Sequence, residues 1–164
     1  MARHGRSAGT LFAVASVIWV LDRLSKLWVE HTLAGRPPIT VIPGVLDLRF
    51  TTNPGGAFSL GQRVPWIFVG ASIVVSVAIV ATAFRRTNVA TSLALGLILG
   101  GAVGNLTDRI VRGPRLSGHV VDFVDLHIWP VFNLADSAIV IGAVILAVTA
   151  FAANRDPEPS HDAG

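Results

Sequence analysis

The chain lacks cysteine and tyrosine, and charged residues make up only 14% of its 164 positions. The absence of cysteine excludes disulfide bonds, thiol catalysis and metal sites with Cys ligands. The charged fraction is well below the roughly 25% of a typical soluble domain, whereas hydrophobic residues make up 52% and the mean hydropathy is +0.63. Charged residues are too few to cover a water-exposed surface, so the composition predicts an integral membrane protein. The length predicts a single domain.

An excess of one charge sign is also missing. The formal net charge is only +3, although the isoelectric point is about 11.0. Without Cys or Tyr, few groups titrate between His and the single Lys26 to lower that value. The basic isoelectric point therefore gives no support to nucleic-acid binding.

Uncharged segments close to the roughly 20 residues that cross a bilayer occur four times. They predict transmembrane helices at about residues 9–28, 64–84, 88–107 and 134–153. The predicted fold class is therefore an all-α membrane protein with four transmembrane helices, and residues 1–154 are expected to form one integral membrane domain. The polar tail, 155–164, contains Pro and is expected to be disordered.

The first apolar run could also be a signal peptide, because Arg3 and Arg6 precede it. The run ends in Leu21-Asp22-Arg23, however, without a convincing small-residue cleavage site. We therefore interpret it as an uncleaved first span.

Four spans place both termini on one side of the membrane. Five Arg residues fall on that side and eight Arg and Lys residues on the other, which by simple counting opposes cytoplasmic termini. The eight are spread over two much longer loops that also carry carboxylates, whereas Arg85-Arg86 occupies a tight turn and is a strong retention signal. We therefore expect both termini in the cytoplasm and both long loops outside.

The first outer loop, about residues 29–63, has the pattern of short strands separated by turns. Residues 39–42 and 46–50 are strand-like and flank Pro43-Gly44, and Asn53-Pro54-Gly55-Gly56 follows as a second turn. This pattern predicts a small antiparallel sheet in the outer loop. Asn53 is a turn residue by default, although a turn of this kind can also bring backbone and a side-chain amide to a ligand.

Ionisable residues near a span need a partner or a function. Asp22 and Lys26 are four residues apart on one helix face, which predicts an ion pair at the membrane interface, with Arg23 as an interfacial anchor. The third span carries a stripe of small residues for close helix packing, followed by three polar residues on one face. The stripe is Gly96, Gly100 and Gly104, and the polar residues are Asn105, Asp108 and Arg109.

Two further aspartates flank the last connection. Asp136 can be explained as the third residue of a helix capped by Asn133, and Asp122 as a solvated loop acid in an apolar, strand-like run. If the fold brings Asp122 and Asp136 together, the pair would share one proton and could activate water for hydrolysis.

Other chemistries have weaker support. No HExxH zinc motif is present, and His119 and His127 have no evident nucleophile partner. Asp122-x-x-Asp125 leaves open a Mg²⁺-dependent lipid transferase or phosphatase, but no second acidic motif accompanies it. A non-enzymatic carrier is also conceivable, although no ionisable residue lies at the predicted centre of a span.

Five sequence blocks, in order, resemble the bacterial lipoprotein signal peptidases, also called type II signal peptidases. They are Asp22-x-x-Ser25-Lys26, Asn53-Pro54-Gly55-Gly56-Ala57-Phe58, Gly100-Gly101-Ala102-x-Gly104-Asn105-x-x-Asp108-Arg109, Val121-Asp122-Phe123 and Phe132-Asn133-x-Ala135-Asp136. The resemblance covers about residues 11–150. It implies an intramembrane aspartic endopeptidase that cuts prolipoproteins just before a diacylglyceryl-modified Cys.

By the same resemblance, Asp122 and Asp136 would be the catalytic dyad. The residues that would bind substrate or support the dyad are Asp22, Lys26, Asn53, Gly104, Asn105, Asp108, Arg109, Asn133 and Ala135. The family needs no metal or other cofactor and is blocked by the cyclic peptide globomycin. The resemblance also implies that the loop holding Asn53 is part of a small, extracytoplasmic, β-rich cradle over the site. It implies a location in the bacterial cytoplasmic membrane with the active site at the outer face, and we expect a monomer in contact with lipid.

Overall fold

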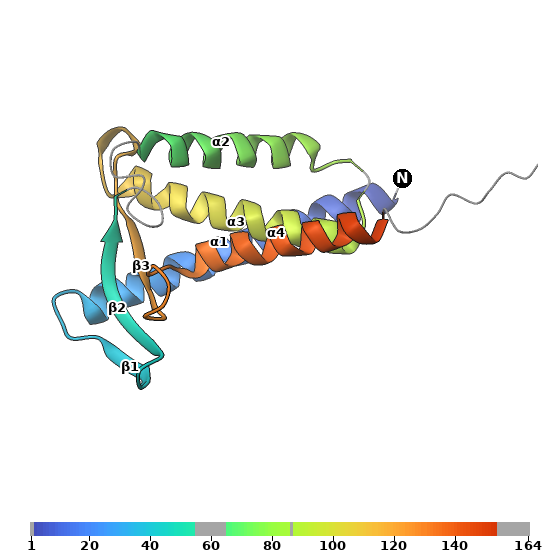
Figure 1. Cartoon of the computed structure of the whole chain (residues 1–164). Coiled ribbons are helices and arrows are strands. Elements are labelled where there is room, and N and C mark those ends of the chain that lie inside the picture. The colour runs from blue at the N-terminus through green and yellow to red at the C-terminus, as the bar shows by residue number, and fades with distance from the viewer. Residues whose placement is uncertain (1, 55–64, 86, 154–164) are drawn as a thin grey trace, which may run out of the picture.

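The helices lie side by side, and a small sheet lies across one end of them (Figure 1). The computed structural model describes residues 2–54, 65–85 and 87–153. The helices within these ranges are α1 (Ala2–Leu33), α2 (Pro65–Thr82), α3 (Val89–Val111) and α4 (Leu134–Ala153), and the strands are β1 (Ile39–Ile42), β2 (Leu46–Asn53) and β3 (Val120–Asp125). The start of α1 and the end of α4 lie at the end of the bundle away from the sheet.

Helix α3 is the central element, because it packs against each of the other three helices. Its glycines permit this approach. A Cβ atom at Gly96 would lie 2.7 Å from the backbone oxygen of Leu11, and one at Gly100 would lie 2.7 Å from that of Ala15. The stripe of small residues predicted on the third span is therefore an interface with α1.

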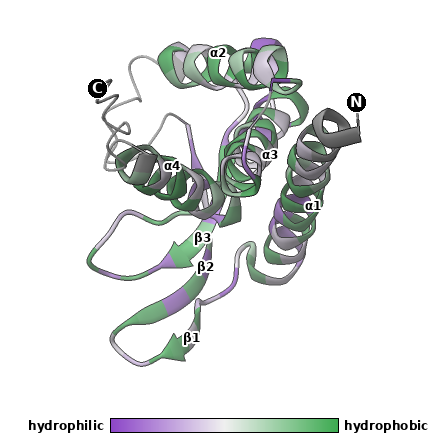
Figure 2. Ribbon diagram, turned by 90° about the vertical axis from the view of Figure 1, so that its right-hand side faces the viewer, coloured by the Kyte–Doolittle hydropathy of each residue, from purple (hydrophilic) through white to green (hydrophobic). Residues whose placement is uncertain are grey.

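The helices carry many exposed apolar side chains, and much of their length is coloured as hydrophobic in Figure 2. Within the described ranges, three helical segments are long and apolar enough to cross a membrane: Ser7–Leu33, Val89–Val111 and Leu134–Ala152. The apolar part of α2, Trp66–Thr82, is shorter than these. The chain is thus a multi-pass membrane protein, and the second predicted span, 64–84, begins outside the described residues.

The first helix continues beyond the predicted span, 9–28, to Leu33. Val29 and Leu33 near its end pack with Val121 and Phe123 of β3 in one buried cluster. The additional helical turns therefore join the bundle to the sheet.

The sheet is antiparallel, with the order β1-β2-β3. The predicted strands at residues 39–42 and 46–50 are confirmed, and the strand-like run around Asp122 forms the third strand. Thr51 lies opposite Asp122 and Asn53 opposite Val120, so the end of β2 is held beside Asp122. After β3 the chain loops out and returns at Phe132, which pairs with Val124 just before α4 begins.

Candidate functional site

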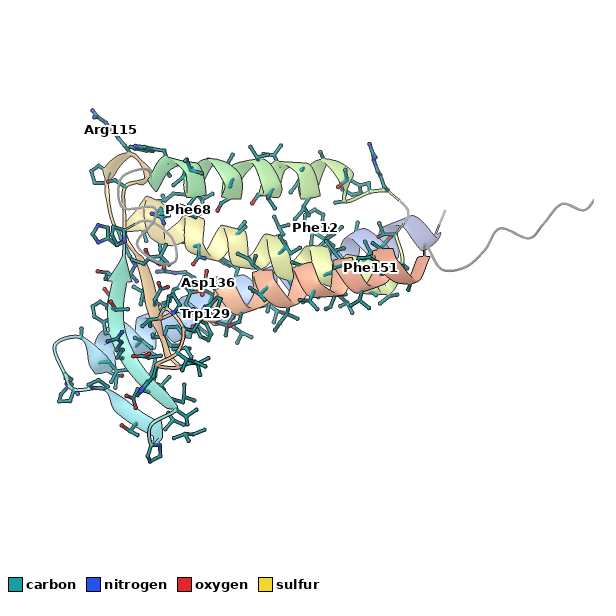
Figure 3. All side chains as sticks on the ribbon, viewed as in Figure 1. Phe12, Phe68, Arg115, Trp129, Asp136 and Phe151 are labelled. Carbon is teal, nitrogen blue, oxygen red and sulfur yellow. The ribbon has the colours of Figure 1, made fainter. Side chains whose placement is uncertain are left out.

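A cleft of about 370 Å³ lies between α2 and α4, at the end of the bundle that carries the sheet. Its apolar walls come from α2, from α4 and from the connection before α4. The polar lining residues are Asn53, Ser72, Asn105, Arg109, Asp122 and Asp136. Figure 3 shows Asp136, Trp129 and Phe68 at this end of the bundle, whereas Phe12 and Phe151 lie towards the other.

Asp136 is fixed by the start of its own helix. The backbone N–H of Asn133 donates to Asp136 Oδ2 at 3.2 Å, and the backbone N–H of Asp136 donates to Asn133 Oδ1 at 2.9 Å. This reciprocal pair is a capping box, which satisfies N–H groups that a helix start otherwise leaves without partners. The predicted capping role of Asn133 is thus present, and Asp136 also lines the cleft.

Asp122 lies on β3 and is only 2% exposed. Asn53 Nδ2 donates to its Oδ2 at 3.0 Å, and Asn133 Nδ2 donates to its Oδ1 at 2.6 Å. Burial, followed by the negative charge of Asp136, raises the pKa of Asp122 to about 6, although hydrogen bonds from the two asparagines act in the opposite direction. A substantial fraction of this carboxyl group is therefore protonated near pH 6.

Asn133 and Asn105 connect the two aspartates. Asn133 binds Asp122 through its side chain and Asp136 through its backbone. Asn105 Nδ2 donates to Asp136 Oδ1 at 2.8 Å, and its Oδ1 accepts from Asn133 Nδ2 at 3.2 Å. Both carboxylates thus belong to one continuous hydrogen-bond network that involves α3, α4, β2 and β3.

Lys26 lies beneath this network with no exposed surface. Its Nζ lies 2.8 Å from Asp22 Oδ2 and 2.9 Å from Asp108 Oδ2, and it donates to Asn105 Oδ1 at 2.9 Å. The ion pair of Asp22 with Lys26 is confirmed, but both side chains are buried in the protein rather than exposed at the end of a helix. Helix α1 continues past both residues to Leu33, so they do not lie at its end. Their polar atoms contact α3 and the start of α4.

Asp22 also joins α1 to the first turn of α4. Its Oδ1 accepts from the backbone N–H of Ala135 at 3.1 Å. A Cβ atom at Gly104 would lie 2.6 Å from Asp22 Oδ2, so only glycine leaves room for that carboxylate. Gly104 and Ala135 therefore belong to the site through close packing.

Arg109 is buried beside the cleft and holds two backbone segments. Its NH1 donates to the carbonyl oxygen of Pro54 at 3.2 Å and to that of Gly118 at 3.3 Å. The contact with Pro54 fixes the turn that carries Asn53. The remainder of that sequence block, residues 55–58, lies outside the described residues.

Residues that the sequence reasoning did not assign to the site complete the surroundings of Asp108. Arg23 and Arg112 lie 2.6 and 3.1 Å from Asp108 Oδ1, and Arg112 also pairs with Glu30 at 2.7 Å. Arg23, predicted as an interfacial anchor, is thus bound to α3. The spacing of Arg112, four residues after Asp108 on the same helix, was a signal for this pair.

Asp125 does not line the cleft. It pairs with Arg49 at 2.9 Å on the sheet. Within the described residues, His, Asp and Glu side chains form no group of three or more that could hold a metal ion.

The fold and site define a class: a multi-pass membrane protein with two linked aspartates in a cleft at one end of its bundle. A family model described as signal peptidase (SPase) II matches residues 14–152. The chain therefore belongs to the signal peptidase II family. It is an aspartic peptidase, and membership in the family implies removal of signal peptides from prolipoproteins.

Similar curated proteins carry the name lipoprotein signal peptidase. That of Rhodococcus jostii (strain RHA1) is 40% identical over 84% of this chain and 70% of its own length. That of Streptomyces griseus is 43% identical over 91% and 76%, and that of Pseudomonas putida is 38% identical over 98% and 96%.

Solved structures agree with the fold. A bacterial membrane enzyme solved by the in meso method at 2.3 Å resolution superposes with a TM-score of 0.80, at 25% identity, over 94% of this chain and 95% of its own. A second, solved at 1.9 Å, gives a TM-score of 0.73 at 28% identity, over 91% and 95%.

Proposed function

We propose that this chain cleaves diacylglyceryl-modified prolipoproteins just before the lipidated Cys, with Asp122 and Asp136 as its catalytic dyad. One observation carries the proposal: both carboxylates line a single cleft and are bound by one residue, Asn133. Asn53 and Asn105 bind the remaining carboxylate oxygens, so all four oxygens of the two aspartates accept a hydrogen bond.

The proposed mechanism uses one proton shared by the two carboxyl groups. The ionised aspartate removes a proton from water while the protonated one donates to the oxygen of the scissile carbonyl, and the water oxygen bonds to the carbonyl carbon. The tetrahedral intermediate then collapses as the C–N bond breaks. The proton taken from water passes to the leaving amine, and the carbonyl oxygen returns its proton, so the dyad again holds one.

The charges of the cluster favour one retained proton. Four cationic side chains, Arg23, Lys26, Arg109 and Arg112, face five carboxyl groups, Asp22, Glu30, Asp108, Asp122 and Asp136. Protonation of one carboxyl group balances the cluster. The raised pKa of Asp122 is consistent with the dyad as the place where that proton resides.

Each remaining site residue has a positioning role in this proposal. Asn53, Asn105 and Asn133 orient the dyad, and Arg109 holds the turn at Pro54 above it. A buried ion-pair cluster lies beneath the dyad and consists of Asp22, Lys26 and Asp108. Gly104 leaves room for the carboxylate of Asp22, and the backbone N–H of Ala135 donates to it.

The proposed function also requires a placement in the membrane. We propose that α2 is also a membrane span, that residues 1–154 form one domain acting as a monomer, and that both termini lie in the cytoplasm. The sheet and the cleft then lie at the outer face of the bacterial cytoplasmic membrane. Because the cleft lies between α2 and α4, the lipid of the substrate could remain in the hydrocarbon while the peptide bond reaches the aspartates.

The test is a gel-shift cleavage assay with purified protein in detergent and a prolipoprotein whose lipobox Cys carries diacylglycerol. We expect cleavage that persists in EDTA, because the proposed chemistry uses neither metal nor cofactor. We also expect globomycin to block it, as the family resemblance implies. Asp122→Asn and Asp136→Asn should each abolish it, while size-exclusion elution and circular dichroism remain those of the wild type.

The matched control is Asp125→Asn, which changes a nearby aspartate of the same strand that lies outside the cleft. Near-full activity in either dyad variant, or loss of activity on chelation, would show the proposed mechanism to be wrong. Absence of cleavage by folded wild type with verified lipidated substrate would reject the proposed function as a whole.

A further inference from the structure

The connection between β3 and α4 forms one wall of the cleft. Its residues 129–132, Trp129-Pro130-Val131-Phe132, all line the cavity, across from Phe68 of α2. The end near α4 is fixed, because Phe132 exchanges backbone hydrogen bonds with Val124 at 2.8 and 3.1 Å. The tip is not part of a regular element, and Ile128 at the tip is 92% exposed.

Four polar side chains hold this tip to the sheet, and we term them the polar staple: Asp47, Arg49, Asp125 and His127. Asp47 and Asp125 lie opposite each other on β2 and β3. The ring of His127 contacts Asp47 Oδ2 through Nε2 at 3.0 Å, and its backbone N–H donates to Asp125 Oδ1 at 2.9 Å. Arg49 pairs with the other oxygen of Asp125 at 2.9 Å.

The backbone at this point is unfavourable without such support. His127 has φ +63°, a left-handed conformation that a residue with a side chain rarely adopts. A conformation of this kind persists where surrounding contacts determine it. The contact of its ring with Asp47 joins residues 80 positions apart, so it fixes the tip with respect to the cradle.

We infer that Asp47 and His127 are positioning residues for substrate binding, because they hold the apolar wall at 129–132 in the position that receives the substrate. This inference rests on the proposed function. Without the staple, the tip samples other positions, and only the fraction of molecules with the wall in place binds substrate well. The apparent dissociation constant for substrate is inversely proportional to that fraction.

The chemical step should be unaffected. The dyad is held by Asn53, Asn105 and Asn133, whose described hydrogen bonds to the aspartates involve no residue of the staple, and the pairing of Phe132 with Val124 lies between the tip and α4. Loss of the staple therefore raises KM and leaves kcat unchanged.

The experiment uses the full-length protein in detergent and a fluorescence-quenched lipopeptide that contains a diacylglyceryl-modified Cys. Asp47→Ala should raise KM about threefold, as expected for the loss of one partly exposed hydrogen bond, with kcat unchanged. Asp47→Asn, which keeps an oxygen for His127, should restore most of the wild-type KM. The same rise is expected for His127→Asn, because Asn tolerates a positive φ but is too short to reach Asp47.

A double-mutant cycle of Asp47→Ala with His127→Asn should show that the two increases in KM do not multiply. His31→Asn, at an exposed histidine in the last turn of α1, is the matched control and should leave KM unchanged. An unchanged KM in both single variants, a loss confined to kcat, or independent effects in the cycle would overturn the inference alone. Failure of the wild type to cleave would overturn the proposed function, and this inference with it.

Discussion

Replacement of Lys26 by Met tests how much the buried ion-pair cluster of Asp22, Lys26 and Asp108 stabilises the protein. Lys26 has no exposed surface, and its ammonium group lies within 2.9 Å of Asp22, Asp108 and Asn105. Met retains most of the chain volume but removes the charge. Asp108 keeps its contacts with two arginines, whereas the Asp22 carboxylate, among the described residues, keeps only the backbone N–H of Ala135.

The cost is therefore that of leaving one buried carboxylate without its cation. Removal of one partner of a buried ion pair destabilises a protein by about 3 to 5 kcal/mol. We expect Lys26→Met to lower the free energy of unfolding by an amount in this range. The double variant Lys26→Met with Asp22→Asn should recover at least about half of that loss, because the uncompensated charge is then absent while the bond to Ala135 can remain.

The measurement is equilibrium or thermal unfolding in detergent micelles, followed by circular dichroism. Arg49→Met is the matched control, because it removes a cation from an ion pair in which Arg49 is 47% exposed. That change should cost no more than about 1 kcal/mol. A Lys26→Met protein within about 0.5 kcal/mol of the wild type, or a double variant without recovery, would refute the reasoning.

Further predictions concern packing, selectivity and pH. Gly104→Ala should destabilise the protein by about 1 to 3 kcal/mol and reduce cleavage, because its Cβ would displace the carboxylate of Asp22; Gly70→Ala, with nothing within 4 Å, should be neutral or slightly stabilising in the same melting assay. Asp125→Asn should retain far more activity than Asp122→Asn in the gel-shift assay, since Asp125 lies outside the cleft and its Oδ1 acceptor is preserved. A raised pKa means that the folded state binds this proton more tightly than the unfolded chain, so the stabilisation from Asp122 is present at acid pH and is lost as pH rises through about 6. Lowering the pH from about 8 to about 5 should therefore raise the melting temperature of the wild type more than that of Asp122→Asn, and equal shifts would contradict the assigned pKa.

The sequence predicted the elements better than their contacts. Charge-free runs identified the helices at 88–107 and 134–153, because a bilayer-facing helix must be apolar along its whole length. Alternation and turn residues identified β1 and β2. The extent of α1 could not be predicted, since its last turns are stabilised by packing against β3, which follows almost 90 positions later.

The same limit applies to the site. The spacing of Asp22 and Lys26 predicted their ion pair because helix geometry is local. Their complete burial depends on Asp108 and Ala135, which reach them only through the packing of α3 and α4. The cross-sheet contact of Asp47 with His127 likewise depends on strand register, which sequence periodicity alone does not determine.

The location of the hydrogen-bond network has a consequence for how the protein can evolve. The network connects α1, α3, α4 and the sheet, whereas α2 supplies only the facing wall of the cleft, through Phe68, Ala71 and Ser72. A substitution in the network changes several bonds at once, whereas one on α2 reshapes the cavity and leaves those bonds intact. If the proposed function is right, we therefore expect the range of accepted substrates to change most readily through substitutions on α2, because these alter the cleft and leave the bonds of the proposed dyad intact.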